Sequence, residues 1–174
     1  MNRPTENDYP EYYHQYIKLT KGKNIEELIF NHSQSIISAI NDLPNEMGDF
    51  AYAENKWTIK ELLQHCIDTE RIFVYRALRF SRKDNQALLG FEEDDYAKNS
   101  MANTRNLQQI KDEFIALRNS SNLFFASLTN EQLQQIGIAS SKQINVNAIV
   151  FICFGHLIHH INILQERYIK QFNT

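Results

Sequence analysis

Three histidines of this chain, His65, His156 and His160, have the type and spacing best suited to metal chemistry. On a helix, four residues correspond to about 40° of rotation and roughly 6 Å of rise, so His156 and His160 project from one face. A third imidazole from another helix, here His65, would complete a three-nitrogen metal site with open coordination positions. That arrangement is typical of catalytic rather than structural zinc. The sequence therefore predicts a metal site more specifically than it predicts a reaction.

Two other histidines, His159 and His32, are alternatives for the same site. His159 follows His156 by three residues but lies some 100° from His160 around a helix, so we expect it at the rim of the site or beside a ligand. His32 occupies the apolar stripe of an earlier helix and is an outside candidate for a fourth polar group. A pair of buried histidines is also compatible with a hydrated seam between helices, and that alternative needs no metal.

Glu70 lies near the centre of an apolar helical arc, where a carboxylate is costly unless it is paired or hydrogen-bonded. In the structural interpretation, Arg71 or an arginine from another helix makes it half of a buried ion pair. In the functional interpretation, Glu70 orients an imidazole or acts as a general base. The sequence favours the structural interpretation and leaves the functional one open.

Arg76, Arg79 and Arg82 form a basic stripe near the end of the same predicted helix. Basic residues there complement the helix dipole, and they could alternatively bind an acidic substrate or the acidic residues 92–95. The chain has no Gly-x-Ser-x-Gly elbow, no glycine-rich phosphate loop and no Cys-x-x-Cys pair. The common signatures of serine-nucleophile, nucleotide and dithiol chemistry are therefore missing.

The bulk properties of the chain indicate one soluble domain, residues 1–174, with an N-terminal arm over residues 1–23. The apolar share of 43% and charged share of 22% are ordinary for a globular protein. A net charge of −3 without a cationic run makes nucleic acid an unexpected partner. No apolar signal run opens the chain, and the apolar stretch 148–154 is too short to cross a membrane. We therefore expect no membrane partner. Both cysteines lie in apolar segments, as is typical of buried cysteines in a reducing cytosol, so we expect a cytoplasmic location.

Long helices are the elements expected to position these residues. Five glycines, three prolines and little polar–apolar alternation disfavour strands. Helical periodicity and capping patterns predict four helices, at 25–43, 58–83, 107–128 and 145–171. The long connector 84–103 can carry the chain the length of the molecule, so helices two and three are expected to run parallel. The predicted fold class is all-α: a four-helix bundle with a long crossover, and an arm whose tyrosine rings pack on the outside.

Several motifs together resemble the DinB-like (YfiT-like) superfamily of damage-inducible bacterial metalloproteins, over nearly the whole chain. They are Tyr12-Tyr13, the run 56–61 (Lys-Trp-Thr-Ile-Lys-Glu), the run 65–71 (His-Cys-Ile-Asp-Thr-Glu-Arg), the run 75–79 (Tyr-Arg-Ala-Leu-Arg), Gly90-Phe91, Asp94-Asp95-Tyr96, the run 155–160 (Gly-His-Leu-Ile-His-His) and Glu166-Arg167-Tyr168. The resemblance implies an up-down-down-up bundle and a divalent metal bound by three histidines, which map to His65, His156 and His160. It also implies a homodimer and a role in stress response. Zinc or nickel is the expected ion, with iron or manganese as alternatives.

Three functions follow from the predicted site and the resemblance. In the first, a metal-dependent enzyme transfers a low-molecular-weight thiol of the bacillithiol or mycothiol kind to an electrophilic small molecule. The ion lowers the pKa of the thiol, and Glu70 or His159 assists proton removal. In the second, the same site activates water in a hydrolase. In the third, the protein binds metal without catalysis as a stress-associated protein. Three protein ligands beside an open cavity would favour chemistry over a structural ion.

Overall fold

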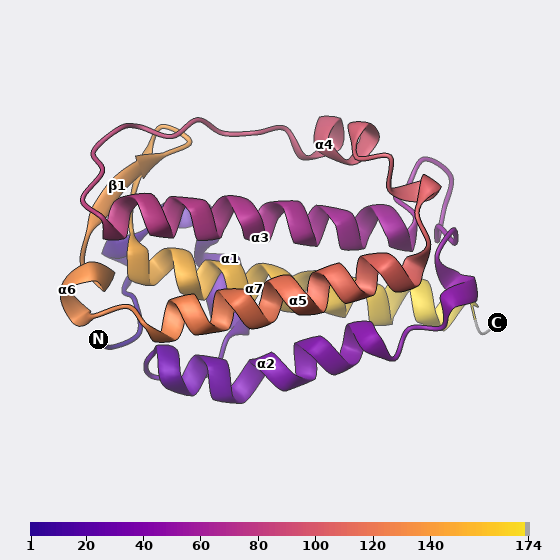
Figure 1. The fold of residues 1–174 in the computed structure, drawn as a ribbon, viewed down its shortest axis with the longest axis horizontal. Helices are drawn as coiled ribbons and strands as arrows, with labels where there is room; N and C mark the ends of the chain where they lie inside the picture. Colours follow the sequence, from indigo (N-terminus) through magenta and orange to yellow (C-terminus); the bar gives the residue numbers. More distant parts are fainter. Residues whose placement is uncertain (173–174) are drawn as a thin grey trace.

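Four long helices run lengthwise through the computed structural model, which describes residues 1–172 (Figure 1). They are α2 (Ile25–Asn41), α3 (Ile59–Ser81), α5 (Leu107–Ala126) and α7 (Val146–Ile163). In Figure 1, α2 and α7 run in one direction along the bundle, while α3 and α5 run in the other. The predicted four-helix bundle with up-down-down-up order is therefore confirmed.

The four long helices begin at side-chain caps. At the N-cap of each one, a side-chain oxygen accepts a hydrogen bond from a backbone N–H of the first turn; these residues are Asn24, Thr58, Asn106 and Asn145. Such a bond satisfies one of the N–H groups that a helix start leaves without a partner. Thr58 also completes a capping box with Glu61. The caps at Asn24 and Thr58 were predicted from the sequence, because capping is a local interaction.

Helix α7 is the central core helix, and every residue from Val146 to Leu157 is buried. A π-helical segment, Leu164–Ile169, and the short α8 (Lys170–Phe172) continue it to the end of the described residues. By length and composition, Val146–Phe172 is the one described helix that could cross a membrane, yet 67% of its most apolar stretch is buried inside the fold. Core packing accounts for its apolar composition, since a helix surrounded by other elements is apolar on all sides.

The crossover between α3 and α5 runs the length of the bundle beside α3 (Figure 1). It contains a short helix, α4 (Glu93–Asn99), and a 3-10 turn at Ala102–Thr104, where the sequence predicted only a connector. Three acidic residues in the first turn of α4 interact favourably with the positive end of its dipole. This local interaction explains why a helix forms there.

A short β-hairpin precedes α7, and the prediction that the chain has no strands was wrong at this point. After the short helix α6 (Asn130–Leu133), strand β1 (Ile136–Ala139) pairs antiparallel with β2 (Lys142–Asn145). The two residues of the connecting turn, Ser140 and Ser141, both have positive φ, at 49° and 64°. A two-residue hairpin turn needs this conformation, which usually selects Asn-Gly or Asp-Gly. Because neither pair is present, the sequence carried no clear hairpin signal.

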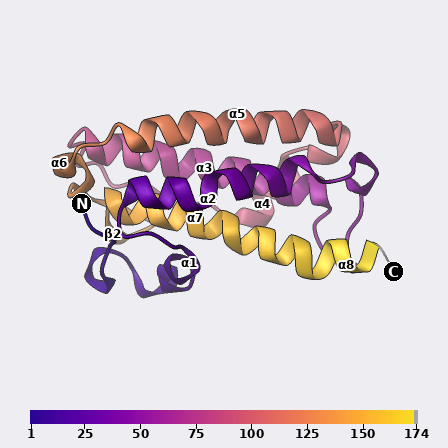
Figure 2. The ribbon, with the colours of Figure 1, turned by 90° about the horizontal axis from the view of Figure 1, so that it is seen from below.

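The N-terminal arm crosses α7 and places α1 (His14–Leu19) against it (Figure 2). Two 3-10 turns, Glu6–Asp8 and Glu11–Tyr13, lead into α1. At the crossing point, a Cβ atom on Gly155 would lie only 2.1 Å from the carbonyl oxygen of Tyr16. Glycine is therefore the residue that lets the two backbones approach this closely.

We expect the substitution Gly155→Ala to lower the free energy of unfolding by about 1–3 kcal/mol, because the new methyl group overlaps the backbone of α1. Urea denaturation followed by circular dichroism measures this difference. An unobstructed glycine-to-alanine change inside a helix has the opposite sign and stabilises by up to about 1 kcal/mol. A stabilised variant would therefore contradict the close contact between the arm and α7.

Candidate metal centre

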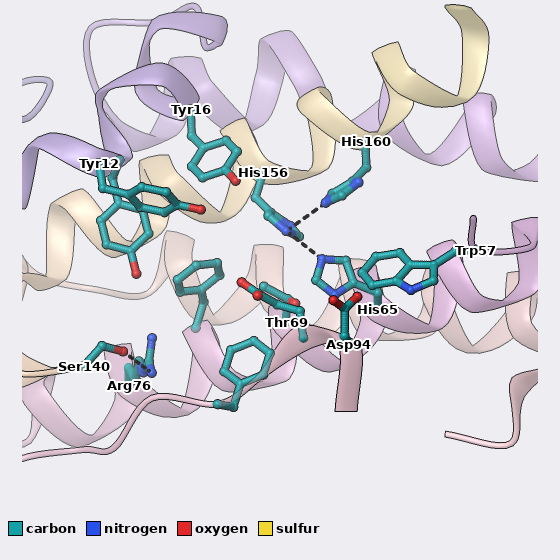
Figure 3. A pocket seen from close by; sticks show the side chains of 14 residues that line it. Tyr12, Tyr16, Trp57, His65, Thr69, Arg76, Asp94, Ser140, His156 and His160 are labelled. Atoms are coloured by element: carbon teal, nitrogen blue, oxygen red, sulfur yellow. Dashed lines mark hydrogen bonds between the residues drawn. The ribbon is translucent and has the colours of Figure 1, made fainter. Parts of the chain in front are cut away.

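The three histidines singled out in the sequence lie together where α3 packs against α7 (Figure 3). The Nε2 atom of His156 lies 3.1 Å from Nε2 of His65 and 3.1 Å from Nε2 of His160. The three ligand nitrogens all fall within 4.8 Å of one another. In a tetrahedral zinc site with bonds of about 2.0–2.1 Å, two ligand nitrogens are about 3.3 Å apart. The cluster therefore has the dimensions of a site for one ion.

Burial keeps these imidazoles neutral, which is the form that binds metal ions. Desolvation lowers the pKa of His65 to about 4 and that of His160 to about 3. It lowers the pKa of His156 well below the ordinary value, and the neighbouring imidazoles lower it further. A neutral imidazole nitrogen donates one hydrogen or offers one lone pair, so Nε2 of His156 cannot make ordinary hydrogen bonds to both neighbours. One divalent cation accepts all three lone pairs, and the residues therefore fit a bound ion.

Aromatic rings pack against the imidazoles and hold them in place. Trp57, just before α3, packs on His65 with ring centroids 4.8 Å apart. Tyr16 of α1 meets His156 edge-on at 5.6 Å, and Phe73 of α3 meets the same ring at 6.1 Å. The arm and α3 thus orient His156 from two sides.

A cavity of about 250 Å³ opens beside the three histidines. Its walls come from the arm, α3, the crossover and the hairpin, which are far apart in sequence. The polar side chains that line it outside the histidine cluster include Thr69, Arg76, Glu93, Asp94 and Ser140. Three protein nitrogens beside an open cavity are typical of a catalytic metal site, since a structural ion usually has four protein ligands.

The tyrosines of the arm do not pack simply on the outside of the domain, as the sequence predicted. Tyr12, Tyr13 and Tyr16 line the cavity, although part of Tyr12 remains exposed. Figure 3 shows Tyr12 and Tyr16 directed toward the same space as His156. Sequence reasoning missed this wall because nothing local to the arm tells which way its rings face. The dense run of tyrosines was the available signal.

The two alternative histidines lie outside the cluster. His159 is half-buried, packs against the rings of Tyr16 and His160, and is not among the residues that line the cavity. Its suggested catalytic role stays a prediction. His32 on α2 accepts a hydrogen bond from the backbone N–H of Lys21 at its Nε2 atom, 2.7 Å away. That nitrogen is already engaged, and His32 does not line the cavity.

Glu70 forms a buried ion pair with an arginine from another helix. Its carboxylate accepts a hydrogen bond from Nη1 of Arg118 on α5, at 3.2 Å, and the two side chains are 1% and 0% exposed. Desolvation raises the pKa of Glu70, while the charge of Arg118 opposes that rise. Arg71 pairs instead with Glu113 near the surface. Since Glu70 is also absent from the cavity walls, its contacts favour the structural interpretation.

We expect Arg118→Met to lower the free energy of unfolding by about 3–5 kcal/mol, because it leaves the Glu70 carboxylate buried without a counter-charge. The double variant Glu70→Gln/Arg118→Met should recover part of this loss. The control Arg71→Met removes a pair whose arginine is half exposed, and should cost less than about 1 kcal/mol. Urea denaturation compares the three variants with the wild type. Equal losses in Arg118→Met and Arg71→Met would contradict this assignment.

We expect the chelator-treated protein, reloaded with zinc or nickel, to bind about one ion per chain, and His156→Ala to lose stoichiometric binding. The Nε2 atom of His156 lies between those of His65 and His160, so these two histidines cannot complete the metal site without it. An ion at about a hundred times its Kd should add about 2.7 kcal/mol to the wild-type stability. His14→Ala, in the arm and outside the cluster, is the matched control. Elemental analysis and thermal unfolding give the two readouts, and absence of ion binding by wild type would refute the site.

Comparisons with known proteins agree with this architecture. Among solved structures, the chain is similar to YfiT from Bacillus subtilis, described as a probable metal-dependent hydrolase with an unusual four-helix bundle topology. The two are 16% identical, the match covers 98% of this chain and 93% of that one, and the TM-score is 0.71. At this identity the likeness supports the fold alone. No curated protein matches the sequence.

A family model gives the assignment. The model of the DinB superfamily matches residues 31–164, which is most of the chain and includes His65, His156 and His160. The chain belongs to the DinB superfamily.

Proposed function

We propose that this protein is a metal-dependent enzyme that acts on a small molecule bound in the cavity beside His65, His156 and His160. The observation that supports this most directly is the convergence of three neutral imidazole nitrogens at the wall of an open cavity. A purely structural ion would need neither the cavity nor the free coordination positions. Zinc or nickel suits such imidazole ligands best, with iron or manganese as alternatives.

The first candidate reaction is transfer of a low-molecular-weight thiol to an electrophile. A divalent cation in the site lowers the pKa of a thiol or water that it binds, and so supplies a nucleophile near neutral pH. Glu93 and Asp94 on the cavity wall can take up the S–H proton before it passes to solvent. The sulfur then forms a bond to the electrophilic carbon as the leaving group departs with its electron pair. The aromatic wall, with Trp57 and Tyr16, can hold an apolar electrophile in place.

The second candidate reaction is hydrolysis of an ester, amide or lactam in the same cavity. The description of YfiT as a probable metal-dependent hydrolase favours it, since the two folds correspond over nearly their full lengths. The carboxylates of Glu93 and Asp94 can hold and orient the attacking water and accept its proton. The two reactions thus differ in the nucleophile and use the same residues.

A cytoplasmic location and a homodimer stay predictions from the sequence.

We expect the zinc- or nickel-loaded protein to accelerate the reaction of bacillithiol or cysteine with monochlorobimane, which becomes fluorescent as chloride leaves. Chelation and His156→Ala should each reduce the rate to that of the free thiol, because the thiol then keeps its ordinary pKa. His14→Ala should react like wild type. An aryl ester, an anilide and a lactam, tested in parallel, measure hydrolysis. Acceleration of only the hydrolytic reactions would select the second candidate, and no acceleration of any would refute the proposed enzyme.

A further inference from the structure

The protein buries two arginines in different electrostatic surroundings. Arg118 is fully buried and has the carboxylate of Glu70 as its counter-charge. Arg76 on α3 is only 4% exposed, yet no carboxylate among the described residues lies within ion-pair distance of it. Desolvation lowers the pKa of Arg76, and among the described residues it is the hydroxyl of Tyr13 that counteracts this. A buried guanidinium without a counter-charge is costly unless a ligand supplies one.

Arg76 is held in place and lines the cavity (Figure 3). Its Nη2 atom donates hydrogen bonds to the carbonyl oxygen of Leu89, at 3.0 Å, and to Oγ of Ser140, at 3.1 Å. Ser140 belongs to the turn of the hairpin and Leu89 to the crossover, so both segments hold the guanidinium in place. A guanidinium has five N–H donors. Even with Tyr13 as a third partner, two N–H groups on Nε or Nη1 remain to donate hydrogen bonds to the oxygens of an anionic ligand.

The guanidinium and the metal cluster face the same cavity at different levels of α3. His65 and Arg76 are eleven residues apart, which on a helix is about 20° of rotation and about 16 Å of rise between their Cα atoms. Both side chains therefore project from one face of α3, with Thr69 and Phe73 between them. A molecule that touches both must be extended, with its anionic group several bonds from the reacting group.

We propose that Arg76 binds a carboxylate group of the small molecule that occupies this cavity, at the end remote from the three histidines. The inference rests on the proposed function in taking the cavity as the substrate site. Glu93 and Asp94 also line the cavity and disfavour a group with two negative charges. A carboxylate, which carries one negative charge, therefore fits better than a phosphate ester, which can carry two.

The test uses the protein's single tryptophan, Trp57, as a reporter, because it lines the cavity. Binding of 8-mercaptooctanoate and of 8-mercapto-1-octanol, which differ only in the terminal group, is followed by its fluorescence in metal-loaded protein. Octanoate and 1-octanol are titrated in the same way into chelator-treated protein. In both pairs the acid should bind wild type roughly ten- to hundredfold more tightly than the alcohol, as expected for hydrogen bonds to a charged group.

Arg76→Gln keeps a hydrogen-bond donor but removes the charge, and should abolish this preference for the acid. Arg82→Gln is the matched control, since it makes the same charge change at an exposed position of the same helical end and should keep the preference. For a readout that needs no variant, the side-chain N–H resonances of Arg76 in wild type should shift with octanoate and not with octanol. This measurement decides the question if Arg76→Gln fails to fold.

Equal affinity of acid and alcohol for wild type would overturn the inference, as would a preference that persists in folded Arg76→Gln. Tighter binding of octyl phosphate than of octanoate would overturn the assignment to a carboxylate. The metal-free titration separates this inference from the proposed function. If the protein binds no ion and catalyses nothing, yet octanoate binding depends on Arg76, the proposed function fails and the carboxylate site stands. If catalysis depends on the metal but the acid binds no more tightly than the alcohol, the proposed function stands and the carboxylate site fails.

Discussion

The packing of α3 against α7 is the contact on which the rest of the structure depends. It brings His65 within 3.1 Å of His156, ninety-one residues away in the chain. Burying three imidazoles at a helix contact is unfavourable unless their nitrogens find partners. In the buried part of α7, Val146–Leu157, all residues are apolar except Asn147 and His156. The unfavourable burial of imidazoles is therefore confined to one place on this helix. A fold that only needed a core would place hydrocarbon here.

The order of the helices also builds the cavity. Because α3 and α5 are parallel, the chain must return along the whole bundle before α5 can begin. That return lies beside α3 and brings Phe91, Glu93 and Asp94 to the wall of the cavity that the three histidines also line. The arm closes another side of the same space, and its approach to α7 depends on the absence of a side chain at Gly155. The cavity walls are thus consequences of connectivity, while the metal ligands come from the long helices.

Two buried charged residues of α3, Glu70 and Arg76, have different roles: the first contributes to stability and the second lies in the cavity. Glu70, on the side of the helix that faces α5, is neutralised within the protein by Arg118. Arg76 is held by neutral acceptors, Leu89 and Ser140, so that its charge remains available in the cavity. On α3, Glu70 therefore forms a buried ion pair in the core, whereas the guanidinium of Arg76 lines the cavity without a carboxylate partner among the described residues. This difference distinguishes the two arginines chemically, although both are buried.

The sequence by itself determined the features that depend on neighbours along the chain. The caps at Asn24 and Thr58 and the shared helical face of His156 and His160 follow from spacings of three and four residues. The long connector likewise predicted the parallel pair of helices. Turn chemistry was the exception, since the strained Ser140–Ser141 turn lacks the usual glycine and the hairpin was not predicted.

Only the tertiary structure decided which distant side chains meet. The sequence left the partner of Glu70 open between Arg71 and an arginine elsewhere, and the contact of α3 with α5 selected Arg118. The sequence also could not show that the tyrosines of the arm face inward. Nor could it show that Arg76 lacks a carboxylate partner within the described part of the chain, whereas Arg79 of the same stripe pairs with Asp84. Periodicity along a helix gives the face on which a side chain lies. The partner it finds there depends on packing between elements that the chain brings together from far apart.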